Sequence, residues 1–301
     1  MKHYEIYKDM LKQPHLLIAG ATGSGKSVII NGLINELIDE SPEDVELILI
    51  DPKRVELAGY RELPHVLNYA SEKDEIEKAL KYSVDEMESR YQQMQAEGIR
   101  RYEDGRLYII IDELADLLTT SKKKILPLIQ RIAQLGRAAE IHLIMATQRP
   151  TKDILSGQLK VNLDSRVALR VPTAVDSRNI INIAGAENLP RYGEAYYLTP
   201  ETMHPVKIKV PYYSDEEISA HVELINEEYE QLHPKQVKRS SEGLKTALAV
   251  IMAVLLSLVS WFALWIATGS VAVFVGGLLV LVVGGAYLIC TKLHCLILHR
   301  V

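Results

Sequence analysis

The sequence predicts an α/β protein with a mainly parallel β-sheet that is covered by helices on both faces. Two observations lead to this fold class. First, short apolar runs alternate with longer stretches in which apolar residues recur every three or four positions, and this alternation is typical of strands joined by crossover helices. Second, the short runs are almost wholly apolar, as expected of strands buried on both faces of a parallel sheet.

The expected elements follow one another along the chain. We expect strands at residues 16–19, 45–50, 107–111 and 141–146, and shorter strands at 167–171, 195–198 and 206–210. Helices are expected at residues 28–40, 71–96, 124–139 and 215–232, the third broken only at Pro127. In the second helix the apolar residues Ile76, Leu80, Val84 and Met87 stand at helical spacing, which indicates one buried face.

A glycine-rich loop joins the first strand to the first helix. Its residues are Gly20, Ala21, Thr22, Gly23, Ser24, Gly25, Lys26 and Ser27, and they fit the pattern G-x-x-x-x-G-K-[ST] in the strand–loop–helix context that it requires. The glycines allow backbone N–H groups to turn toward phosphate oxygens. Lys26 is expected to reach the β- and γ-phosphates of ATP, and Ser27 to offer its hydroxyl to Mg²⁺. The alternative is a glycine-rich turn that binds no ligand.

A second acidic motif is expected in a phosphate-loop enzyme. The apolar run at residues 107–111 leads into Asp112 and Glu113. We expect Asp112 to hold Mg²⁺ through its water shell. We expect Glu113 to accept a proton from the attacking water. An acidic residue that caps a helix would give the same letters. Gln148 follows the next strand, where ligands bind in open α/β sheets, so it is predicted to sense the γ-phosphate rather than to be an ordinary loop amide.

Charge and cysteine content exclude some classes. The chain has 34 Lys and Arg and 39 Asp and Glu; three of the basic residues and none of the acidic ones lie after residue 243, so residues 1–243 carry 31 basic and 39 acidic residues, or net −8. This excludes a globally basic nucleic-acid binder but not a local basic patch. The only cysteines are Cys290 and Cys295, so a disulfide framework is excluded. The polar N-terminus shows no secretory signal.

Two uncharged stretches near the C-terminus predict a transmembrane hairpin. Residues 246–266 and 271–290 provide 21 and 20 residues without a charge, and each can span about 30 Å of hydrocarbon as a helix. Residues 267–270 are left as a tight turn. Basic residues flank both spans and none lies in the turn, which places both ends on the cytoplasmic side. The alternative is a buried helical hairpin of a soluble protein.

Seven short motifs occur in order: DPKRVEL at 51–57, LPH at 63–65, EMESRY at 86–91, GRAA at 136–139, ATQRP at 146–150, DSR at 176–178 and GAE at 185–187. Together they resemble the motor domain of FtsK/SpoIIIE DNA translocases, from about His15 to Val210. The resemblance implies a RecA-like ATPase that acts as a hexameric ring around double-stranded DNA. It also implies that Arg137 enters the neighbouring subunit's ATP site as an arginine finger. The alternative for Arg137 is pairing with the C-terminal dipole of its own helix.

The chain departs from the family pattern in several places. The membrane helices follow the motor instead of preceding it, the helical domain before the motor is reduced to residues 1–14, and a winged-helix module after the motor has no room. Glu140 stands where the family usually has glycine. These departures favour, by analogy, a compact membrane-tethered relative from a mobile element or phage over a chromosome-segregation protein.

DNA contact is expected from residues 149–160. This segment carries Arg149, Lys152 and Lys160 against one acidic residue, and in a six-fold ring it would place many cations around a channel, where they suit phosphate contact without base reading. The alternative is a solvated loop.

The expected organisation is a lead-in at 1–14, a motor domain at 15–232, a basic juxtamembrane linker at 233–245, a transmembrane hairpin at 246–290 and a cytoplasmic tail at 291–301. We therefore expect an ATP- and Mg²⁺-dependent translocase of double-stranded DNA that forms a homo-hexamer. It is expected to be a multi-pass protein of the bacterial cell membrane with its motor in the cytoplasm. One alternative is a secretion or conjugative-coupling ATPase that moves protein or single-stranded DNA. Another is a membrane-bound scaffold with a degenerate nucleotide site, but the intact Lys26, Ser27, Asp112 and Glu113 argue against it.

Overall fold

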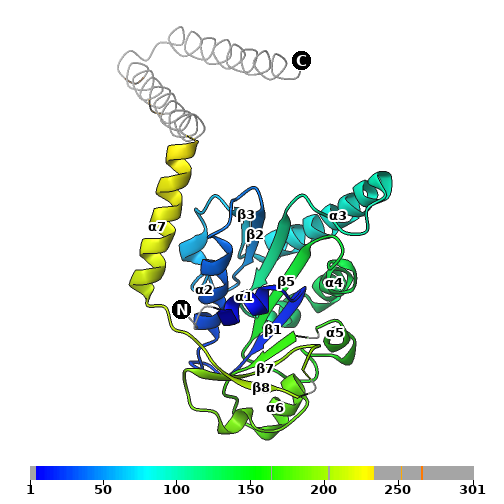
Figure 1. The fold of residues 1–301 in the computed structure, drawn as a ribbon, viewed down its shortest axis with the longest axis vertical. Coiled ribbons are helices and arrows are strands. Elements are labelled where there is room, and N and C mark those ends of the chain that lie inside the picture. Colours follow the sequence, from blue (N-terminus) through cyan, green and yellow to red (C-terminus); the bar gives the residue numbers. More distant parts are fainter. Residues whose placement is uncertain (1–4, 164, 203, 234–251, 253–265, 267–301) are drawn as a thin grey trace. The chain divides into compact units, whose positions relative to one another are not determined.

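The strands form one sheet in the order β3-β2-β4-β5-β1-β6-β7-β8 (Figure 1). The structure is a computed structural model, and it describes residues 5–163, 165–202, 204–233, 252 and 266. The strands are β1 (His15–Ala19), β2 (Val45–Ile50), β3 (Val66–Ala70), β4 (Arg106–Ile111), β5 (Ile141–Thr147), β6 (Ser165–Ala168), β7 (Glu194–Leu198) and β8 (Val206–Lys209). The helices are α1 (Glu5–Leu11), α2 (Lys26–Leu37), α3 (Lys73–Glu97), α4 (Leu114–Leu135), α5 (Gly157–Val161), α6 (Ala174–Ile181) and α7 (Asp215–Leu232), with short 3₁₀ turns η1 (Ala58–Tyr60) and η2 (Ala186–Asn188).

The strand directions confirm the expected α/β class with a mainly parallel sheet. All pairs from β3 through β6 are parallel, whereas β7 and β8 are antiparallel additions at one edge. β5 lies between β4 and β1. Because these three strands are parallel, their carboxyl ends meet at the same edge of the sheet, and the residues that follow them are brought together.

The two faces of the sheet carry separate apolar cores, which explains why the central strands are mostly apolar. Leu17 and Ala19 of β1 pack into the core that α3, α4, α5 and α6 cover. Leu16 and Ile18 pack into the opposite core, which α1 and α2 cover. Successive side chains of a strand point to opposite faces, so a strand between two layers of helices needs apolar residues at every position.

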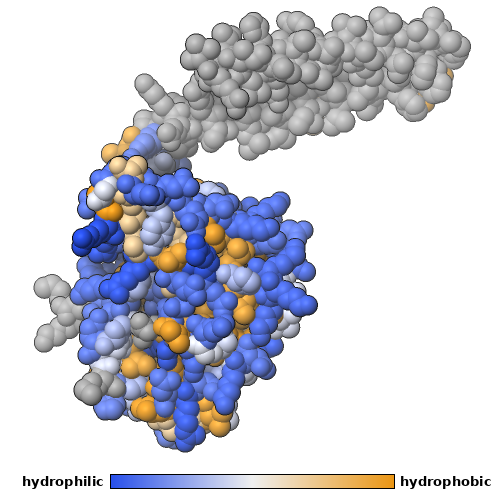
Figure 2. All heavy atoms as spheres, turned by 90° about the vertical axis from the view of Figure 1, so that its right-hand side faces the viewer, coloured by the Kyte–Doolittle hydropathy of each residue, from blue (hydrophilic) through white to orange (hydrophobic). Residues whose placement is uncertain are grey.

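The surface over α3, α4 and α5 is largely hydrophilic, with small scattered hydrophobic areas (Figure 2). In α4, for example, Ile125, Ile129 and Ile132 are buried at helical spacing. These helices therefore direct their apolar stripes to the sheet and their polar faces to solvent.

The first helix, α1, is packed onto the domain. Tyr7 and Met10 are fully buried in the same core as α2. The ring of Tyr7 lies directly against Gly32, at a position where a Cβ atom would collide with it. The expected lead-in at residues 1–14 thus includes a helix whose close approach to α2 depends on a glycine.

Four main strands, the long second helix and the last helix lie where the sequence predicts them, but several expectations were wrong. β3 was missed because it is a sheet-edge strand with half-exposed residues and no continuous apolar run. The third predicted helix corresponds to α4, which begins at Leu114, ten positions before the expected start. Its non-helical residue is Ser121 rather than Pro127. β6 ends at Ala168 instead of residue 171, and the short helices α5 and α6 were not predicted.

The chain divides into two units, residues 1–229 and residues 230–301. In the part that the structure describes, no helix is both long and apolar enough to cross a membrane. The predicted spans at 246–266 and 271–290 lie outside the described residues, apart from Met252 and Ile266, and the hairpin stays a prediction.

Candidate active site

The glycine-rich loop follows β1 at the carboxyl edge of the sheet. Gly23 and Gly25 have φ angles of +69° and +97°, a conformation that glycine adopts without steric cost. The N–H of Ala21 donates to the carbonyl oxygen of Arg170 (2.8 Å), which ties the loop to the chain that follows β6. α2 begins at Lys26, so its positive end points into the loop, as phosphate binding requires.

A cavity of about 580 Å³ lies over this loop, within the usual range for small-molecule sites. Residues 21–28 line one side of it, together with Gln148. The remaining wall includes apolar and aromatic side chains, namely Leu169, Tyr192, Val210 and Tyr212. Such a wall offers a flat ring of a ligand a surface to stack on. These four residues were not predicted, because they lie far beyond the loop in sequence and belong to no motif that names them.

Arg191 adds a cation beside the loop. One nitrogen of its guanidinium lies 3.1 Å from the position that a Cβ atom of Gly23 would take. The guanidinium also lies over the ring of Tyr192, 5.3 Å from its centroid. This residue was not predicted either, since an arginine after a proline in a loop carries no signal of its own.

Lys26 and Asp112 form a buried ion pair. The Lys26 Nζ atom lies 2.7 Å from Asp112 Oδ1, and the two side chains are 5% and 1% exposed. The same ammonium donates to the backbone carbonyl oxygen of Asp112 (2.5 Å). The structure therefore brings the two predicted residues together, with the lysine resting on the carboxylate that follows β4.

The residues around this pair fit a magnesium ion. The other carboxylate oxygen of Asp112, Oδ2, is buried and has no hydrogen-bond partner among the described residues. Ser27 lines the cavity beside Lys26. Within the described part of the chain, no group of three or more His, Cys, Asp or Glu residues forms a metal cage. Mg²⁺ is usually held by one or two protein groups together with water and substrate phosphates, and Asp112 and Ser27 are such groups.

Glu113 is held in place by several donors. Its side chain is 2% exposed, and it accepts hydrogen bonds from the Ala115 N–H (3.3 Å), the Thr147 hydroxyl (2.8 Å) and the Gln148 N–H (3.0 and 3.1 Å to its two oxygens). Glu113 also caps α4. The capping role and the predicted catalytic role therefore fall on the same carboxylate.

Gln148 connects the end of β5 to the glycine-rich loop. Its side-chain oxygen accepts a hydrogen bond from the Thr22 hydroxyl (2.8 Å), and both residues line the cavity. The predicted sensor is thus placed over the phosphate loop, and a ligand there would compete for this bond.

The segment after β2 brings a further cation to the site. The buried carboxylate of Asp51 accepts from the N–H groups of Arg54 (2.9 Å) and Leu57 (3.0 Å), which fixes the turn. The Lys53 Nζ atom then lies 3.5 Å from Asp116 and 3.9 Å from Glu113. Lys53 belongs to a motif that contributes to the family resemblance, but its place beside Glu113 was not predicted from the sequence.

Arg137 lies at the other end of the parallel strands, where their amino ends meet. It stands exposed between the end of α4 and the start of β5. The seven residues of β5 extend over about 20 Å, so this side chain cannot reach the loop over the carboxyl edge of its own sheet.

His15, the first residue of β1, has a strongly shifted pKa. Burial of its imidazole and, second, the charge of His142 lower this pKa to about 3.

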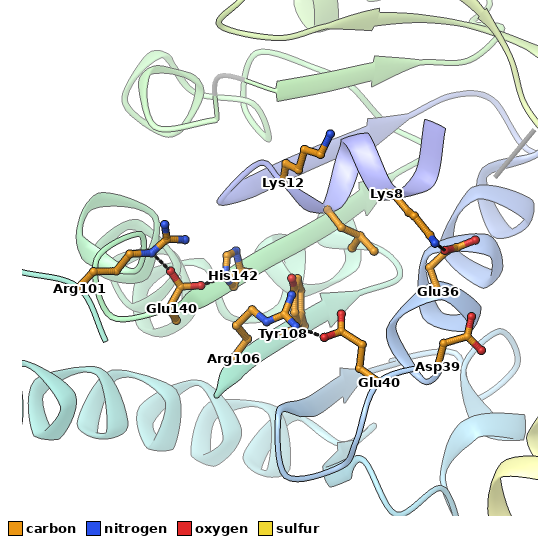
Figure 3. Close-up of a pocket in the computed structure, with 11 residues that line it drawn as sticks. Lys8, Lys12, Glu36, Asp39, Glu40, Arg101, Arg106, Tyr108, Glu140 and His142 are labelled. Carbon is orange, nitrogen blue, oxygen red and sulfur yellow. Dashed lines mark hydrogen bonds and ion pairs between the residues drawn. The ribbon is translucent and has the colours of Figure 1, made fainter. Parts of the chain in front are cut away.

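A second cavity of about 640 Å³ opens near the amino ends of β4 and β5 (Figure 3). Its charges are largely paired with one another: Lys8 with Glu36, Arg101 with Glu140, and Arg106 with Glu40.

Glu140 in this cavity has a φ of +53°, which is uncommon for a residue other than glycine. Glycine, which the family that the sequence resembles usually has at this position, adopts such a conformation without steric cost. Burial alone would raise the pKa of Glu140, but the hydrogen bonds with His142 and Arg101 outweigh burial and lower the pKa to about 2.

The segment predicted to contact DNA leaves the carboxyl edge. Arg149 and Lys152 are exposed, whereas Lys160 lies half-buried in α5. The Lys160 ammonium donates to the carbonyl oxygen of Asn179 (3.1 Å), and burial, followed by the charges of Arg166 and Lys152, lowers its pKa. Lys160 therefore has a structural contact that the sequence did not reveal.

Known proteins match this chain in sequence. The model of the FtsK/SpoIIIE family matches residues 2–108 and 105–152, which together make half of the chain. DNA translocase FtsK of Caldanaerobacter subterraneus subsp. tengcongensis is 41% identical over 245 residues, covering 77% of this chain and 34% of that protein. DNA translocase FtsK of Pseudomonas putida is 38% identical over 255 residues, covering 72% of this chain and 31% of that protein. The chain thus spans about a third of the length of these curated relatives.

Solved structures match the fold. The pCW3 conjugation coupling protein TcpA, solved as a monomer with ATPγS, superposes with a TM-score of 0.62 at 26% identity, covering 70% of this chain and 64% of that one. The cytoplasmic domain of the Thermomonospora curvata type VII secretion ATPase EccC gives a TM-score of 0.59 at 27% identity, covering 70% of this chain and 28% of that one. The family match and these neighbours confirm the expectation of ATP hydrolysis.

Proposed function

The chain belongs to the FtsK/SpoIIIE family, and on that basis we propose that it hydrolyses ATP to move double-stranded DNA through a ring of its own copies. The observation that carries the proposal is the meeting of Lys26, Asp112 and Glu113 at one edge of the sheet, beside a ligand-sized cavity. Curated relatives that are 41% and 38% identical to this chain are named DNA translocases. The full activity is a proposal, because the chain spans only a third of those proteins.

Hydrolysis would use three groups of the chain. Lys26 would exchange the carboxylate of Asp112 for β- and γ-phosphate oxygens and neutralise the charge that develops there. Glu113 would take the proton of the water whose oxygen bonds to the γ-phosphorus, while the bond to the bridging oxygen breaks and ADP leaves. Asp112 and Ser27 would hold Mg²⁺, which polarises the phosphate oxygens when it is bound. The apolar wall at Leu169, Tyr192, Val210 and Tyr212 would take the adenine ring.

Arg137 would complete the site of a neighbouring copy. It lies at the edge opposite the glycine-rich loop, so its catalytic use requires an assembly in which this edge meets the loop of another subunit. A closed ring, which we propose to be hexameric, repeats such a head-to-tail contact at every interface. The guanidinium would then stabilise charge on the transferred phosphoryl group.

DNA contact would come mainly from Arg149 and Lys152. Both are exposed beside the carboxyl edge, and residues 1–243 carry a net charge of −8, so any attraction to DNA must come from local cations that face a channel. Lys160 contributes less directly, since its ammonium is bonded to the end of α6.

We place the protein at the bacterial cell membrane, with the motor in the cytoplasm. The two uncharged stretches at 246–266 and 271–290 are long enough to span the bilayer, and the flanking cations favour cytoplasmic ends. A mobile element or phage is the proposed genetic context, by analogy, because the predicted anchor follows the motor instead of preceding it.

A second candidate is a coupling or secretion ATPase. Solved structures that match the fold are a conjugation coupling protein and a type VII secretion ATPase. In that case the cargo would be single-stranded DNA or protein, and the same catalytic edge would serve another channel.

ATPase rates with duplex DNA, with single-stranded DNA and without nucleic acid separate these candidates. The DNA motor predicts stimulation by duplex of any sequence, because phosphate contacts carry no base information, and loss of stimulation as salt rises. Lys152→Gln should weaken stimulation, whereas Arg100→Gln, a matched charge loss in an exposed position before β4, should leave it unchanged. Equal rates with and without either nucleic acid, in rings of confirmed size, would favour the secretion candidate.

A further inference from the structure

The candidate catalytic base is held in one orientation by hydrogen bonds, most of them to one of its two oxygens. Oε1 of Glu113 accepts from the Ala115 N–H, the Thr147 hydroxyl and the Gln148 N–H, while Oε2 accepts from the same Gln148 N–H. An oxygen whose lone pairs are already taken must lose a donor before it can accept a proton from water, and this applies to Oε1. Oε2 has one shared donor, and the Lys53 ammonium lies 3.9 Å from it. The bonds to Oε1 hold the carboxylate in one orientation, so turning Glu113 toward an attacking water requires that at least one of them opens.

The shortest of these bonds comes from Thr147, the last residue of β5. Its hydroxyl donates to Glu113 Oε1 at 2.8 Å, and the side chain is fully buried. The same hydroxyl oxygen accepts a hydrogen bond from the backbone N–H of Arg149 at 3.1 Å. A displacement of residue 149 is thus transmitted through one hydroxyl group to the carboxylate.

The neighbouring residue connects the same place to the nucleotide side. The Gln148 side-chain oxygen is bonded to the Thr22 hydroxyl of the glycine-rich loop, and its backbone N–H is bonded to Glu113. Three consecutive residues, 147 to 149, therefore contact the phosphate loop, the candidate base and the start of the segment proposed to meet DNA.

We propose that Thr147 is a positioning residue that holds Glu113 in an inactive orientation, and that engagement of the DNA backbone by residues 149–152 opens this bond. The first half of the proposal concerns the hydrolytic site alone. The second half rests on the proposed function, since it requires that duplex DNA binds the segment after β5. In this arrangement the chain hydrolyses ATP slowly until its cargo is in place.

Thr147→Val removes the hydroxyl and keeps the shape of the side chain, and Thr147→Ser keeps the hydroxyl. In the full-length chain, purified in mild detergent, we expect Thr147→Val to raise kcat without DNA about tenfold, the effect of one hydrogen bond to a charged group, while KM for ATP is unchanged. The rate with saturating duplex DNA should stay near that of the unmodified chain, so the stimulation ratio falls. Thr147→Ser should return the DNA-free rate toward that of the unmodified chain.

The opposite pattern would overturn the proposal. A merely structural threonine predicts that Thr147→Val lowers both rates together, and that serine gives no rescue. If the unmodified chain shows no stimulation by DNA, the proposed DNA motor and the release by DNA both fail, whereas the DNA-free rate of Thr147→Val still decides whether Thr147 restrains Glu113.

A measurement on the unmodified chain needs no variant to fold. The Gln148 N–H is protected by its bonds to Glu113, so its hydrogen exchange should be slow with a non-hydrolysable ATP analogue alone and faster after duplex DNA is added. Unchanged exchange of the peptide that spans residues 147–149, under conditions where DNA is bound, would refute the release.

Discussion

Replacing Lys26 by methionine should destabilise the nucleotide-free protein in addition to preventing ATP binding. The ammonium lies 2.7 Å from Asp112 Oδ1 in a pair whose side chains are 5% and 1% exposed. Methionine keeps an unbranched apolar stem, so the change mainly removes the charge. A buried carboxylate left without its cation costs about 3–5 kcal/mol, which for a unit of this size corresponds to a fall in Tm of about 10 °C.

A double-mutant cycle isolates the pair. The free energy of unfolding is measured in urea without nucleotide for Lys26→Met, Asp112→Asn and the double variant, in the chain truncated after Gly243. Each single change should cost about 3 kcal/mol, and the double variant should cost little more than either one, because a neutral amide needs no cation. A loss below about 1 kcal/mol for Lys26→Met, or additive losses, would refute the buried pair.

Three further predictions follow from the same structure. Mixed rings of inactive Glu113→Gln subunits and inactive Arg137→Ala subunits should regain part of the ATPase activity, because some interfaces then hold both intact groups; no recovery at any ratio would argue that Arg137 is structural. His15 has a pKa lowered from 6.5 to about 3 by burial, so its neutral form is favoured in the folded state and stability should fall by about 1.4 kcal/mol per pH unit as pH drops below 6.5. Urea unfolding at pH 5 and pH 7.5 should show a smaller difference for His15→Asn, whose oxygen can still accept the Leu143 N–H that now donates to His15 (3.1 Å). A reporter fused after residue 301 should lie in the cytoplasm, and removal of residues 244–301 should release the motor from the membrane; a reporter on the outer face would refute the hairpin topology.

The sequence predicted the elements whose physical signal is local. Strands such as β2 and β4 are buried on both faces, so most of their residues are apolar, with Glu46 and Arg106 as exceptions, and the run is visible in the sequence. The glycine-rich loop is visible for a similar reason, since its left-handed residues at Gly23 and Gly25 require glycine.

Features that depend on distant contacts were not predictable. The aromatic wall of the cavity at Tyr192 and Tyr212 arises only when the chain after β6 folds back over the loop. The contact of Lys160 with Asn179 likewise joins two helices that carry no motif for it. β3 was missed because it lies at the sheet edge, where Leu67 and Asn68 are exposed and only Ala70 of its residues is buried.

Glu113 combines two roles that its position in the sequence suggests, a helix cap and a candidate catalytic base. Its carboxylate caps α4 and is also placed beside Lys53 and the end of β5. From the sequence, a helix cap and a catalytic base are alternative interpretations of this residue, but in the structure the side chain that caps α4 also lies at the candidate site. Only the hydrogen bonds from Thr147 and Gln148 reveal that the carboxylate is held back.

ATP-driven displacement of a third strand from duplex DNA tests the central claim most directly. A short oligonucleotide bound as a triplex at one end of a duplex is released only when a motor moves along that duplex, so the assay reports movement rather than hydrolysis. We predict release that requires ATP, falls with rising salt and is abolished by Glu113→Gln. Rings of confirmed size that hydrolyse ATP but leave the triplex intact, at low salt and saturating duplex, would contradict the account of this chain as a DNA-moving motor.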